Sequence, residues 1–283
     1  MIEGIFRQKV SYDTWNNNYR WQDETPWETF GRIARAVASV EEPEKRAYWY
    51  DRYYNLLSEC LFTGAGRITS NAGTGLSGAS LVNCFVSGID QDDPDSIEGI
   101  YRELLNQATI LKSEGGYGMN FGILRPKGTP IKGTGVLSPG AVAFMRMWNQ
   151  SSRIITSGEG QGSGGKKKIR KGAMMGVMPI WHPDVLEFIY AKSKADNGLD
   201  LFNISILVSD FFMSCVDNDQ PWHFLFPDTQ HPAYKSEWRG DITDWIHKYP
   251  ESYTMIHYGK ARDLWTEVMK VLYQRNEPGV LFE

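Results

Sequence analysis

Three cysteines carry the most reactive side chains of this 283-residue sequence: Cys60, Cys84 and Cys215. A thiol can donate hydrogen and electrons and can be regenerated by exchange with another thiol. An odd, sparse set of cysteines argues against a disulfide framework and indicates a reducing compartment. Cys84 follows a glycine-rich stretch and lies in a short apolar segment, where a buried, unreactive cysteine is the commoner arrangement. Its position alone therefore does not make it a catalytic residue.

A second candidate is the glycine-rich, strongly basic stretch at 157–172, SGEGQGSGGKKKIRKG. Residues 160–166 match the pattern G-x-x-x-x-G-K of phosphate-binding loops. However, Lys167 stands where a Ser or Thr would bind magnesium, and a helical segment precedes the match instead of a strand. Two interpretations stay open: a solvated loop, or a loop that closes over a nucleotide and binds its phosphates through backbone N–H groups and basic side chains.

Two further motifs combine reactive side chains with turn-forming residues. The run EGGYGMN at 114–120 has glycines that either end a helix or allow a planar ligand, such as a base, to lie against bare backbone. His182-Pro183-Asp184 contains two metal-ligand types, but no third ligand stands at metal spacing. We therefore expect this motif to cap the next helix, and we expect no metal site.

The elements around these residues indicate an α/β fold. Residues 1 to about 60 have apolar residues at helical spacing, for example at 26–37. Glycine and polar residues predict loops at 63–80 and 128–140. Strands are predicted at 80–86, 119–124, 173–180, 202–208 and 279–282, and helices at 97–113 (capped by Asp95 or Ser96), 141–156, 182–192 and 261–275. The strand–helix–strand unit at 80–124 is the building block of α/β domains.

Composition excludes several classes of protein. The formal net charge is -4, which is unlike that of a protein that coats DNA, and no nucleic-acid partner is expected. Hydrophobic residues make up 41% and aromatic residues 13%, which indicates a packed core and not disorder. No run of about 18 apolar residues and no signal-peptide pattern is found, so neither a membrane span nor secretion is expected.

Six motifs in the same order resemble segments of the ribonucleotide reductase catalytic subunit, from about residue 20 to the last residue. They are GRI at 66–68 with NAGT at 71–74; NCFVSG at 83–88; DSI at 95–97; GGYGMNF at 115–121 with LRPKG at 124–128 and IKG at 131–133; RKGAMMG at 170–176 with HPD at 182–184 and EFI at 187–189; and NISI at 203–206. Each motif is modest alone, and their order makes the resemblance specific.

The resemblance implies a helical N-terminal region at 1–62, followed at 63–283 by about half of the family's ten-stranded α/β barrel of two five-strand halves. No ATP-cone domain is expected before residue 20. The family's finger loop, its second redox cysteine and its C-terminal thiol pair have no counterpart in this sequence. The implied partner is therefore a C-terminal half of the catalytic subunit, either from a split gene or from a longer chain.

The family reduces ribonucleoside di- or triphosphates to deoxyribonucleotides by radical chemistry. By resemblance, Cys84 is one of two thiols that form a disulfide as the 2′-hydroxyl leaves as water. Substrate-binding residues are implied at Asn83, Gly115, Gly116, Arg170 and Ala173.

A regulatory site is implied by the same resemblance. The residues that match the family's specificity-effector region, where a dNTP or ATP lies near a dimer interface, are Asp95, Ser96, Ile97, Arg125 and Lys132. The 157–172 loop would relay the identity of the effector to the substrate base. Its insertion GEGQGSGGKKK is longer than the family pattern.

The radical source is not encoded in this sequence. NCFVSG and the short N-terminus are most similar to the adenosylcobalamin-dependent class, and the alternative is a separate metal-containing radical subunit, as in phage-type enzymes. A thioredoxin-like reductant and a bacterial or phage-infected cytoplasm are implied. Two other functions are weighed against this one: a non-catalytic nucleotide-binding regulatory protein derived from the same fold, and a P-loop phosphotransferase.

Overall fold

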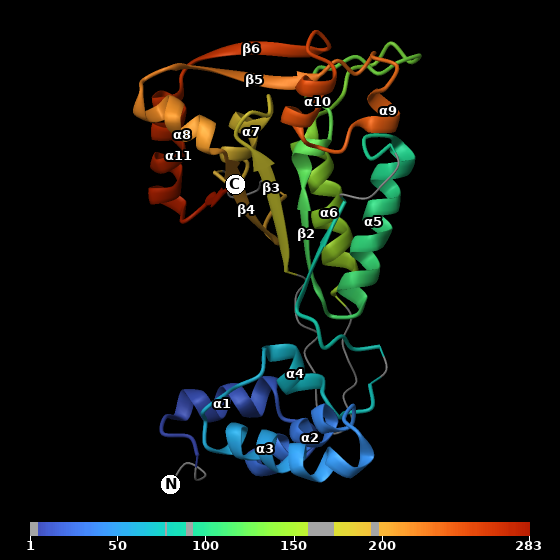
Figure 1. Cartoon of the computed structure of the whole chain (residues 1–283), viewed down its shortest axis with the longest axis vertical. Helices are drawn as coiled ribbons and strands as arrows, with labels where there is room; N and C mark the ends of the chain where they lie inside the picture. The colour runs from blue at the N-terminus through green and yellow to red at the C-terminus, as the bar shows by residue number, and fades with distance from the viewer. Residues whose placement is uncertain (1–4, 77, 89–92, 158–172, 194–197) are drawn as a thin grey trace. The chain divides into compact units, whose positions relative to one another are not determined.

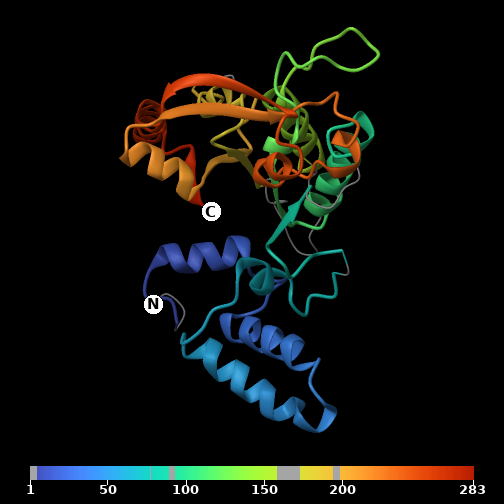
Figure 2. The same ribbon diagram turned by 45° about the horizontal axis from the view of Figure 1, so that its top comes forward.

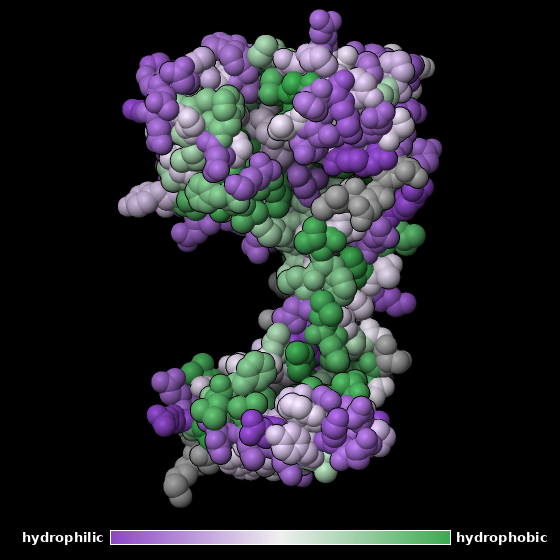
Figure 3. Space-filling model, in the orientation of Figure 1, coloured by the Kyte–Doolittle hydropathy of each residue, from purple (hydrophilic) through white to green (hydrophobic). Residues whose placement is uncertain are grey.

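The computed structural model describes residues 5–76, 78–88, 93–157, 173–193 and 198–283. The chain divides into two compact units (Figure 1). The helical unit comprises residues 1–84, 112–115 and 156–170, and the α/β unit comprises residues 85–111, 116–155 and 171–283. Within the described residues, no helix is both long enough and apolar enough to cross a membrane. Apolar side chains reach the surface in both units (Figure 3).

The helical unit contains α1 (Lys9–Asn18), α2 (Pro26–Ala38), a 3-10 helix (Pro43–Lys45), α3 (Arg46–Ser58) and α4 (Gly66–Asn71). Thr25 and Glu28 form a capping box at the start of α2, and Pro26 occupies its first position, where no N–H is needed. A small core of Ile33, Ala34, Leu57 and Ala72 joins α2, α3 and the end of α4.

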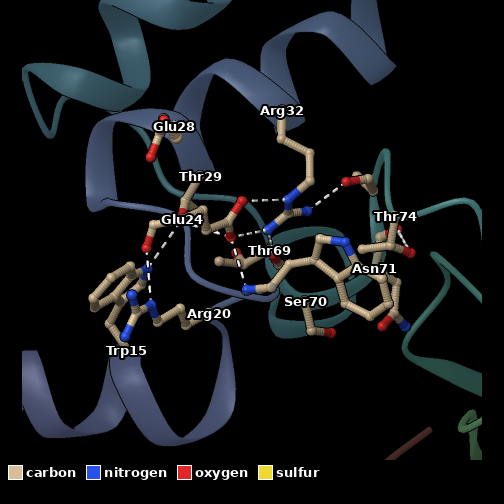
Figure 4. Close-up of polar contacts among 12 residues, drawn as sticks. Trp15, Arg20, Glu24, Glu28, Thr29, Arg32, Thr69, Ser70, Asn71 and Thr74 are labelled. Atoms are coloured by element: carbon tan, nitrogen blue, oxygen red, sulfur yellow. Dashed lines mark hydrogen bonds and ion pairs between the residues drawn. The ribbon is translucent and has the colours of Figure 1, made fainter. Parts of the chain in front are cut away.

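A buried ion pair ties α2 to the chain on both sides of it (Figure 4). The Arg32 guanidinium donates to both carboxylate oxygens of Glu24, at 2.8 and 2.9 Å, and also to the backbone oxygens of Thr69 and Ala72. Trp15 of α1 donates to the Thr29 hydroxyl at 3.0 Å, and that hydroxyl donates to Glu24. The loop predicted at 63–80 is wrong in part, because residues 66–71 form α4. Arg32 stabilises the end of this helix by donating to the Thr69 and Ala72 oxygens.

The α/β unit is built on a five-stranded sheet with the order β1-β2-β3-β4-β7. The strands are β1 (Cys84–Ser87), β2 (Gly116–Asn120), β3 (Met174–Pro179), β4 (Phe202–Val208) and β7 (Gly279–Phe282), and the pairs β2/β3, β3/β4 and β4/β7 are parallel. The strands predicted at 173–180, 202–208 and 279–282 are confirmed. So are the helices α5 (Ile97–Lys112), α6 (Ala141–Ile155) and α11 (Ala261–Arg275).

Two predicted strands are displaced. The segment 80–83 is exposed and turns on itself, with the Val82 N–H donating to the Ser80 hydroxyl, so β1 begins only at Cys84. β2 begins at Gly116 and not at residue 119, because Tyr117 and Met119 alternate into the core at 2% and 4% exposure. After β2 the Asn120 side chain accepts the Gly122 N–H, which turns 121–123 into a 3-10 helix.

Helices α5 and α6 lie side by side next to β2 (Figures 1 and 2). The Gln107 side chain of α5 donates to the Trp148 backbone oxygen of α6 at 3.0 Å. Beneath them, Phe121 meets the rings of Trp148 and Phe202 edge to face, at 5.5 and 5.7 Å. This aromatic cluster fixes both helices against the sheet, since such ring pairs add specific geometry to apolar burial.

The segment after β4 completes the unit. It contains α8 (Asp210–Asp217), the antiparallel pair β5 (Pro221–Pro227) and β6 (Tyr253–Lys260), and between them α9 (Tyr234–Glu237) and α10 (Ile242–Lys248). The side chain of Ser209 caps α8 by accepting the Phe212 N–H. Rings of Phe226, Tyr234, Trp238 and Trp245 pack against one another, so residues 217–260, for which the sequence predicts no elements, are held by aromatic contacts.

Replacing Arg32 with Met should destabilise the helical unit by about 3 kcal/mol, because Glu24 would remain buried without its partner. The matched control is Arg35→Met, which removes an exposed guanidinium from the same helix and should cost less than about 1 kcal/mol. Urea unfolding, monitored by hydrogen exchange of the α2 amides, measures the free energy of unfolding of both variants. Equal stability of the two variants would contradict the role given to the ion pair.

Candidate functional site

The start of α5 is shaped by backbone contacts. The Ser96 hydroxyl accepts the Gly99 N–H at 3.0 Å and donates to the Asp93 backbone oxygen at 2.8 Å, so Ser96 is the cap of this helix. A Cβ on Gly99 would collide with the backbone of Asp93 and Pro94. Glycine inside a helix costs about 1 kcal/mol relative to alanine. Close approach of the 93–94 backbone explains why it is tolerated here.

Asp95 is the buried centre of this region, with a side chain only 3% exposed. Its carboxylate accepts the backbone N–H of Arg125 at 2.8 Å, the Arg125 guanidinium at 2.5 Å and the Tyr234 hydroxyl at 2.8 Å. Burial raises the pKa of Asp95, and the positive charge of Arg125 together with the three donated hydrogen bonds opposes that rise. The three residues come from three separate parts of the chain and form one satisfied polar cluster.

Beside this cluster lies a cavity of about 180 Å³, which we call the Asp95 pocket. All five residues predicted for an effector site line it: Asp95, Ser96, Ile97, Arg125 and Lys132. Asp93, Ser138 and Lys235 complete the polar part of the lining, and Ile100 and Phe144 provide apolar walls. The five predicted residues span positions 95 to 132 of the sequence, and the structure brings them together at one cavity.

The loop at 128–138 presents Lys132 to the pocket. Its two sides are joined by backbone hydrogen bonds, from Ile131 to Val136 at 2.9 Å and from Ser138 to Thr129 at 2.8 Å. Lys132 lies in the exposed turn between them. This loop has the backbone pairing of a short hairpin, which the glycine and proline content of the sequence did not reveal.

His182 and Asp184 hold both ends of that loop. The Asp184 carboxylate accepts the N–H of Lys127 at 3.0 and 3.2 Å and the N–H of Ala141, the first residue of α6, at 2.9 Å. His182 is fully buried; one ring nitrogen lies 2.9 Å from the Leu124 oxygen and the other accepts the Asp184 N–H. Accepting at Nδ1 requires the proton to be on Nε2, so His182 is neutral and donates to Leu124.

The prediction that this motif caps the next helix is therefore wrong. α7 is short, Val185–Ile189, and Asp184 makes no side-chain hydrogen bond to it. The carboxylate instead caps α6, which lies over 40 residues earlier in the chain. Sequence spacing favours the nearest helix, but the parallel sheet brings the end of β3 beside the ends of the 128–138 loop. In the described residues, no group of three or more His, Cys, Asp or Glu side chains could hold a metal ion.

The residues predicted for substrate binding are divided between the units. Cys84 is a free, exposed thiol at the first position of β1, so the buried arrangement considered for it is not found. Asn83 beside it is exposed, and Gly115 is buried in the same helical unit. In the α/β unit, Gly116 and Ala173 lie at the starts of paired strands, where the Tyr117 N–H donates to the Ala173 oxygen at 3.0 Å. Arg170 and the loop match at 160–166 lie outside the described residues.

Two of the motifs meet within the helical unit. Arg67 of the GRI motif pairs with Glu114, which precedes the glycines at 115–116, at 2.7 Å, and both side chains are less than one-fifth exposed. The Ser80 N–H donates to the Ser113 oxygen at 3.0 Å. The segment before Cys84 is thus fastened to the segment before Gly115.

The other two cysteines lie in different surroundings. Cys215 is buried, and burial raises the pKa of its thiol. Cys60 is exposed and borders a separate, largely apolar cavity of about 760 Å³ in the helical unit.

Sequence reasoning missed Tyr234 and Lys235. Neither belongs to a motif with a recognisable pattern, and both lie in the segment for which the sequence predicted no elements. Tyr234 stands 139 residues from the aspartate to which it donates. Only the tertiary structure places α9 at the Asp95 pocket.

Acidification should destabilise the α/β unit through His182. Burial lowers the pKa of His182 below its ordinary value near 6.5, although the Asp184 charge opposes the shift. The unfolded chain therefore binds more protons below about pH 6.5, and stability falls as pH falls through that window. In urea titrations, His182→Gln should be less stable than the parent at pH 7.5 by about 1–3 kcal/mol. The difference in unfolding free energy between variant and parent should shrink at pH 5. A difference that does not change with pH would contradict a neutral His182. The control is His247→Gln, at an exposed histidine.

Comparison with known proteins identifies the family. Residues 82–283 match the model of the ribonucleotide reductase barrel domain, and residues 5–77 match that of the ribonucleotide reductase all-alpha domain. The vitamin B12-dependent ribonucleoside-diphosphate reductase of Thermoplasma acidophilum is 31% identical over 83% of this chain, and that of Mycobacterium tuberculosis is 32% identical over 73%. The ribonucleoside-diphosphate reductase large subunit of vaccinia virus is 32% identical over 81%.

The chain spans 26 to 28% of the length of these relatives. The two matched domains follow one another in the order of the helical region and the parallel-stranded region described above. Together they cover nearly all of the described sequence, and the chain belongs to the ribonucleotide reductase large-subunit family.

Proposed function

We propose that this chain takes part in the reduction of ribonucleoside diphosphates to deoxyribonucleotides. The observation that carries the proposal is the free, exposed thiol of Cys84 at the start of β1, at the beginning of the matched barrel domain. The names of the relatives support a diphosphate substrate. Because the chain spans about a quarter of those relatives, the reaction is proposed for a complete enzyme of which this chain is one part.

In the proposed reaction the Cys84 thiol and a second thiol supply two electrons and two protons. One hydrogen replaces the hydroxyl at C2′ of the ribose, the other leaves with that hydroxyl as water, and the two sulfurs form a disulfide. A thioredoxin-like dithiol then reduces the disulfide by exchange. Buried Cys215 is a poor candidate for the second thiol, because only a thiolate exchanges and burial raises its pKa. We place the second thiol in the remaining part of the enzyme.

The substrate pocket is proposed to use exposed Asn83 and the backbone around Gly115, Gly116 and Ala173. Glycine leaves the backbone bare, so that a base or ribose can approach it closely. The paired starts of β2 and β3 supply two adjacent backbone segments for this purpose. Arg170 and the basic 157–172 loop are proposed to contact the substrate and to relay the identity of the effector.

The Asp95 pocket is proposed as the specificity site for a dNTP or ATP. Asp95 supplies an acceptor for a ribose hydroxyl, and Lys132 supplies a cation for phosphate. Next to the pocket, α5 exposes a stripe of apolar residues four positions apart: Ile97, Tyr101 and Leu105, at 59, 56 and 65% exposure. Residues at this spacing share one helix face. We propose that this face forms a dimer with the same helix of a second copy.

The barrel is proposed to be completed by a C-terminal half, supplied by a separate chain or by the same polypeptide. β7 is last in the order of the described sheet, and its Leu281 and Phe282 are 38 and 65% exposed. A parallel sheet is normally covered on both faces and extended at its edges by further strands. Pairing of β7 with the next strand would satisfy its free backbone groups and bury these two side chains.

The radical source is proposed to be adenosylcobalamin, with a separate metal-containing subunit as the alternative. Relatives of both descriptions are similar to this chain: two are named as vitamin B12-dependent, and the vaccinia virus large subunit is not. In this proposal the cofactor supplies the radical, and the described residues supply the reducing thiol and the nucleotide pockets. The free cysteines fit a reducing compartment, for which we propose the cytoplasm.

The dNTP site is tested by Lys132→Ala. Removing one charge-assisted hydrogen bond should weaken binding of dNTPs by about tenfold or more, measured by calorimetry. Lys127→Ala is the matched control, because Lys127 belongs to the same connection but pairs with Glu187 and does not line the pocket. If dNTPs at millimolar concentration do not bind the parent chain, the effector site is refuted.

The role of Cys84 is tested by Cys84→Ser in the complex with the C-terminal half, assayed with and without adenosylcobalamin. Activity should be abolished, because a hydroxyl cannot form the disulfide. Cys60→Ser, at the other exposed thiol, should retain activity. A complex that remains active with Cys84→Ser would favour the non-catalytic regulatory protein, in which this chain only binds nucleotide.

A further inference from the structure

We propose that Lys235 of α9 is a phosphate ligand of the Asp95 pocket and makes the pocket selective for a nucleoside triphosphate over a monophosphate. The inference rests on the proposed effector site and adds a residue from outside every motif that suggested it. α9 belongs to the segment between β5 and β6 and has no counterpart among the motifs at 66–206.

Tyr234 fixes the position of Lys235. It is 2% exposed, its hydroxyl donates to Asp95 at 2.8 Å, and its ring lies 5.9 Å from the Arg125 guanidinium carbon. A buried side chain held by a hydrogen bond and by a cation–π contact has little freedom. The next residue, Lys235, is therefore anchored at the rim of the pocket, which it lines.

The size of the pocket shows where the ligand must extend. Nucleotide-sized ligands occupy pockets of about 300–1,000 Å³. The Asp95 pocket holds about 180 Å³, so part of a nucleotide would lie beyond its rim. The exposed charged side chains in the pocket lining are Lys132 and Lys235, whereas Arg125 is turned inward to Asp95. The part of the ligand outside the cavity is accordingly expected to be the phosphates.

Charge at the rim distinguishes the two lysines. In the described part of the chain no carboxylate pairs with Lys132, whereas the Lys235 ammonium lies 3.6 Å from an Asp93 carboxylate oxygen. The Lys235 side chain is 73% exposed, and such exposed pairs contribute about 0–1 kcal/mol. A phosphate can therefore displace Asp93 from Lys235 at little cost.

Asp93 has the opposite effect on the ligand. It lines the same pocket and repels an approaching anion. A monophosphate offers only one phosphate group at the rim, which Lys132 can bind alone, so it would gain little from Lys235. A triphosphate reaches Lys235 and replaces the weak pair with a charge-assisted contact. The pair thus acts as a filter for phosphate length.

Three variants of the full chain test the inference by calorimetry at low salt, with dATP, dGTP and dTTP as probes and dTMP for comparison. Lys235→Ala should weaken triphosphate binding by about tenfold and leave dTMP binding within about twofold. Asp93→Asn should tighten triphosphate binding by about threefold, since it removes a repelling charge. Lys248→Ala, which removes a half-exposed lysine paired with Asp244 and away from the pocket, should change neither.

The two substitutions are expected to change triphosphate affinity in opposite directions, which distinguishes a phosphate ligand from a structural ion pair. If Lys235→Ala and Asp93→Asn weaken binding equally, or if Lys235→Ala binds triphosphates as the parent does, the inference is overturned while the effector site stands. If the parent binds no dNTP, the effector site itself fails. Hydrogen exchange of α5 and α9 shows whether each variant keeps its fold, and raising the salt concentration should shrink the difference between Lys235→Ala and the parent.

Discussion

The carboxylate of Asp184 is the group on which the geometry of the Asp95 pocket depends. It accepts backbone N–H groups from Lys127 and Ala141, so both ends of the 128–138 loop are fixed to the end of β3. A Cβ on Gly140 would lie 2.7 Å from this carboxylate, which shows how closely the chain approaches it. Neutral His182 fixes the chain just before Arg125. The loop that carries Lys132, a proposed phosphate ligand, is thereby held at both ends by buried, hydrogen-bonded side chains.

The same helix serves the core and the pocket. One face of α5 is buried, with Ile100, Gln107 and Leu111 packed or hydrogen-bonded inside, while its first turn forms a wall of the Asp95 pocket. Gly99 allows the 93–94 backbone to lie against that turn. Any shift of α5 against the sheet would therefore also move Asp95. This shared element offers a physical route by which a ligand at the pocket can influence strand β2, whose first residue, Gly116, is proposed to contact the substrate.

Much of the fold was predictable from local pattern. The short, mainly apolar segments at 202–208 and 279–282 predicted strands, and the amphipathic spacing at 97–113 and 261–275 predicted helices. Both patterns are local, because burial of one face or of both faces of an element sets the spacing of its apolar residues. The strand predicted to begin at residue 119 begins at Gly116 instead, since only packing reveals that Tyr117 and Met119 alternate inward. The segment 217–260 gave no prediction, because its short strands and helices are stabilised by aromatic contacts between residues far apart.

The sequence by itself determined the family resemblance, the α/β class and five of the residues that line the Asp95 pocket, because ordered motifs and periodic apolar residues are local properties of a chain. Only the tertiary structure decided that Cys84 is exposed, that Asp184 caps α6 and not the helix that follows it, that Tyr234 reaches Asp95 and that Lys235 lines the pocket. The hydrogen bonds of Asp184 to α6 and of Tyr234 to Asp95 span 43 and 139 residues. These contacts depend on the parallel sheet and on the packed rings of Phe226, Tyr234, Trp238 and Trp245, which bring distant parts of the chain together. No local sequence pattern predicts them.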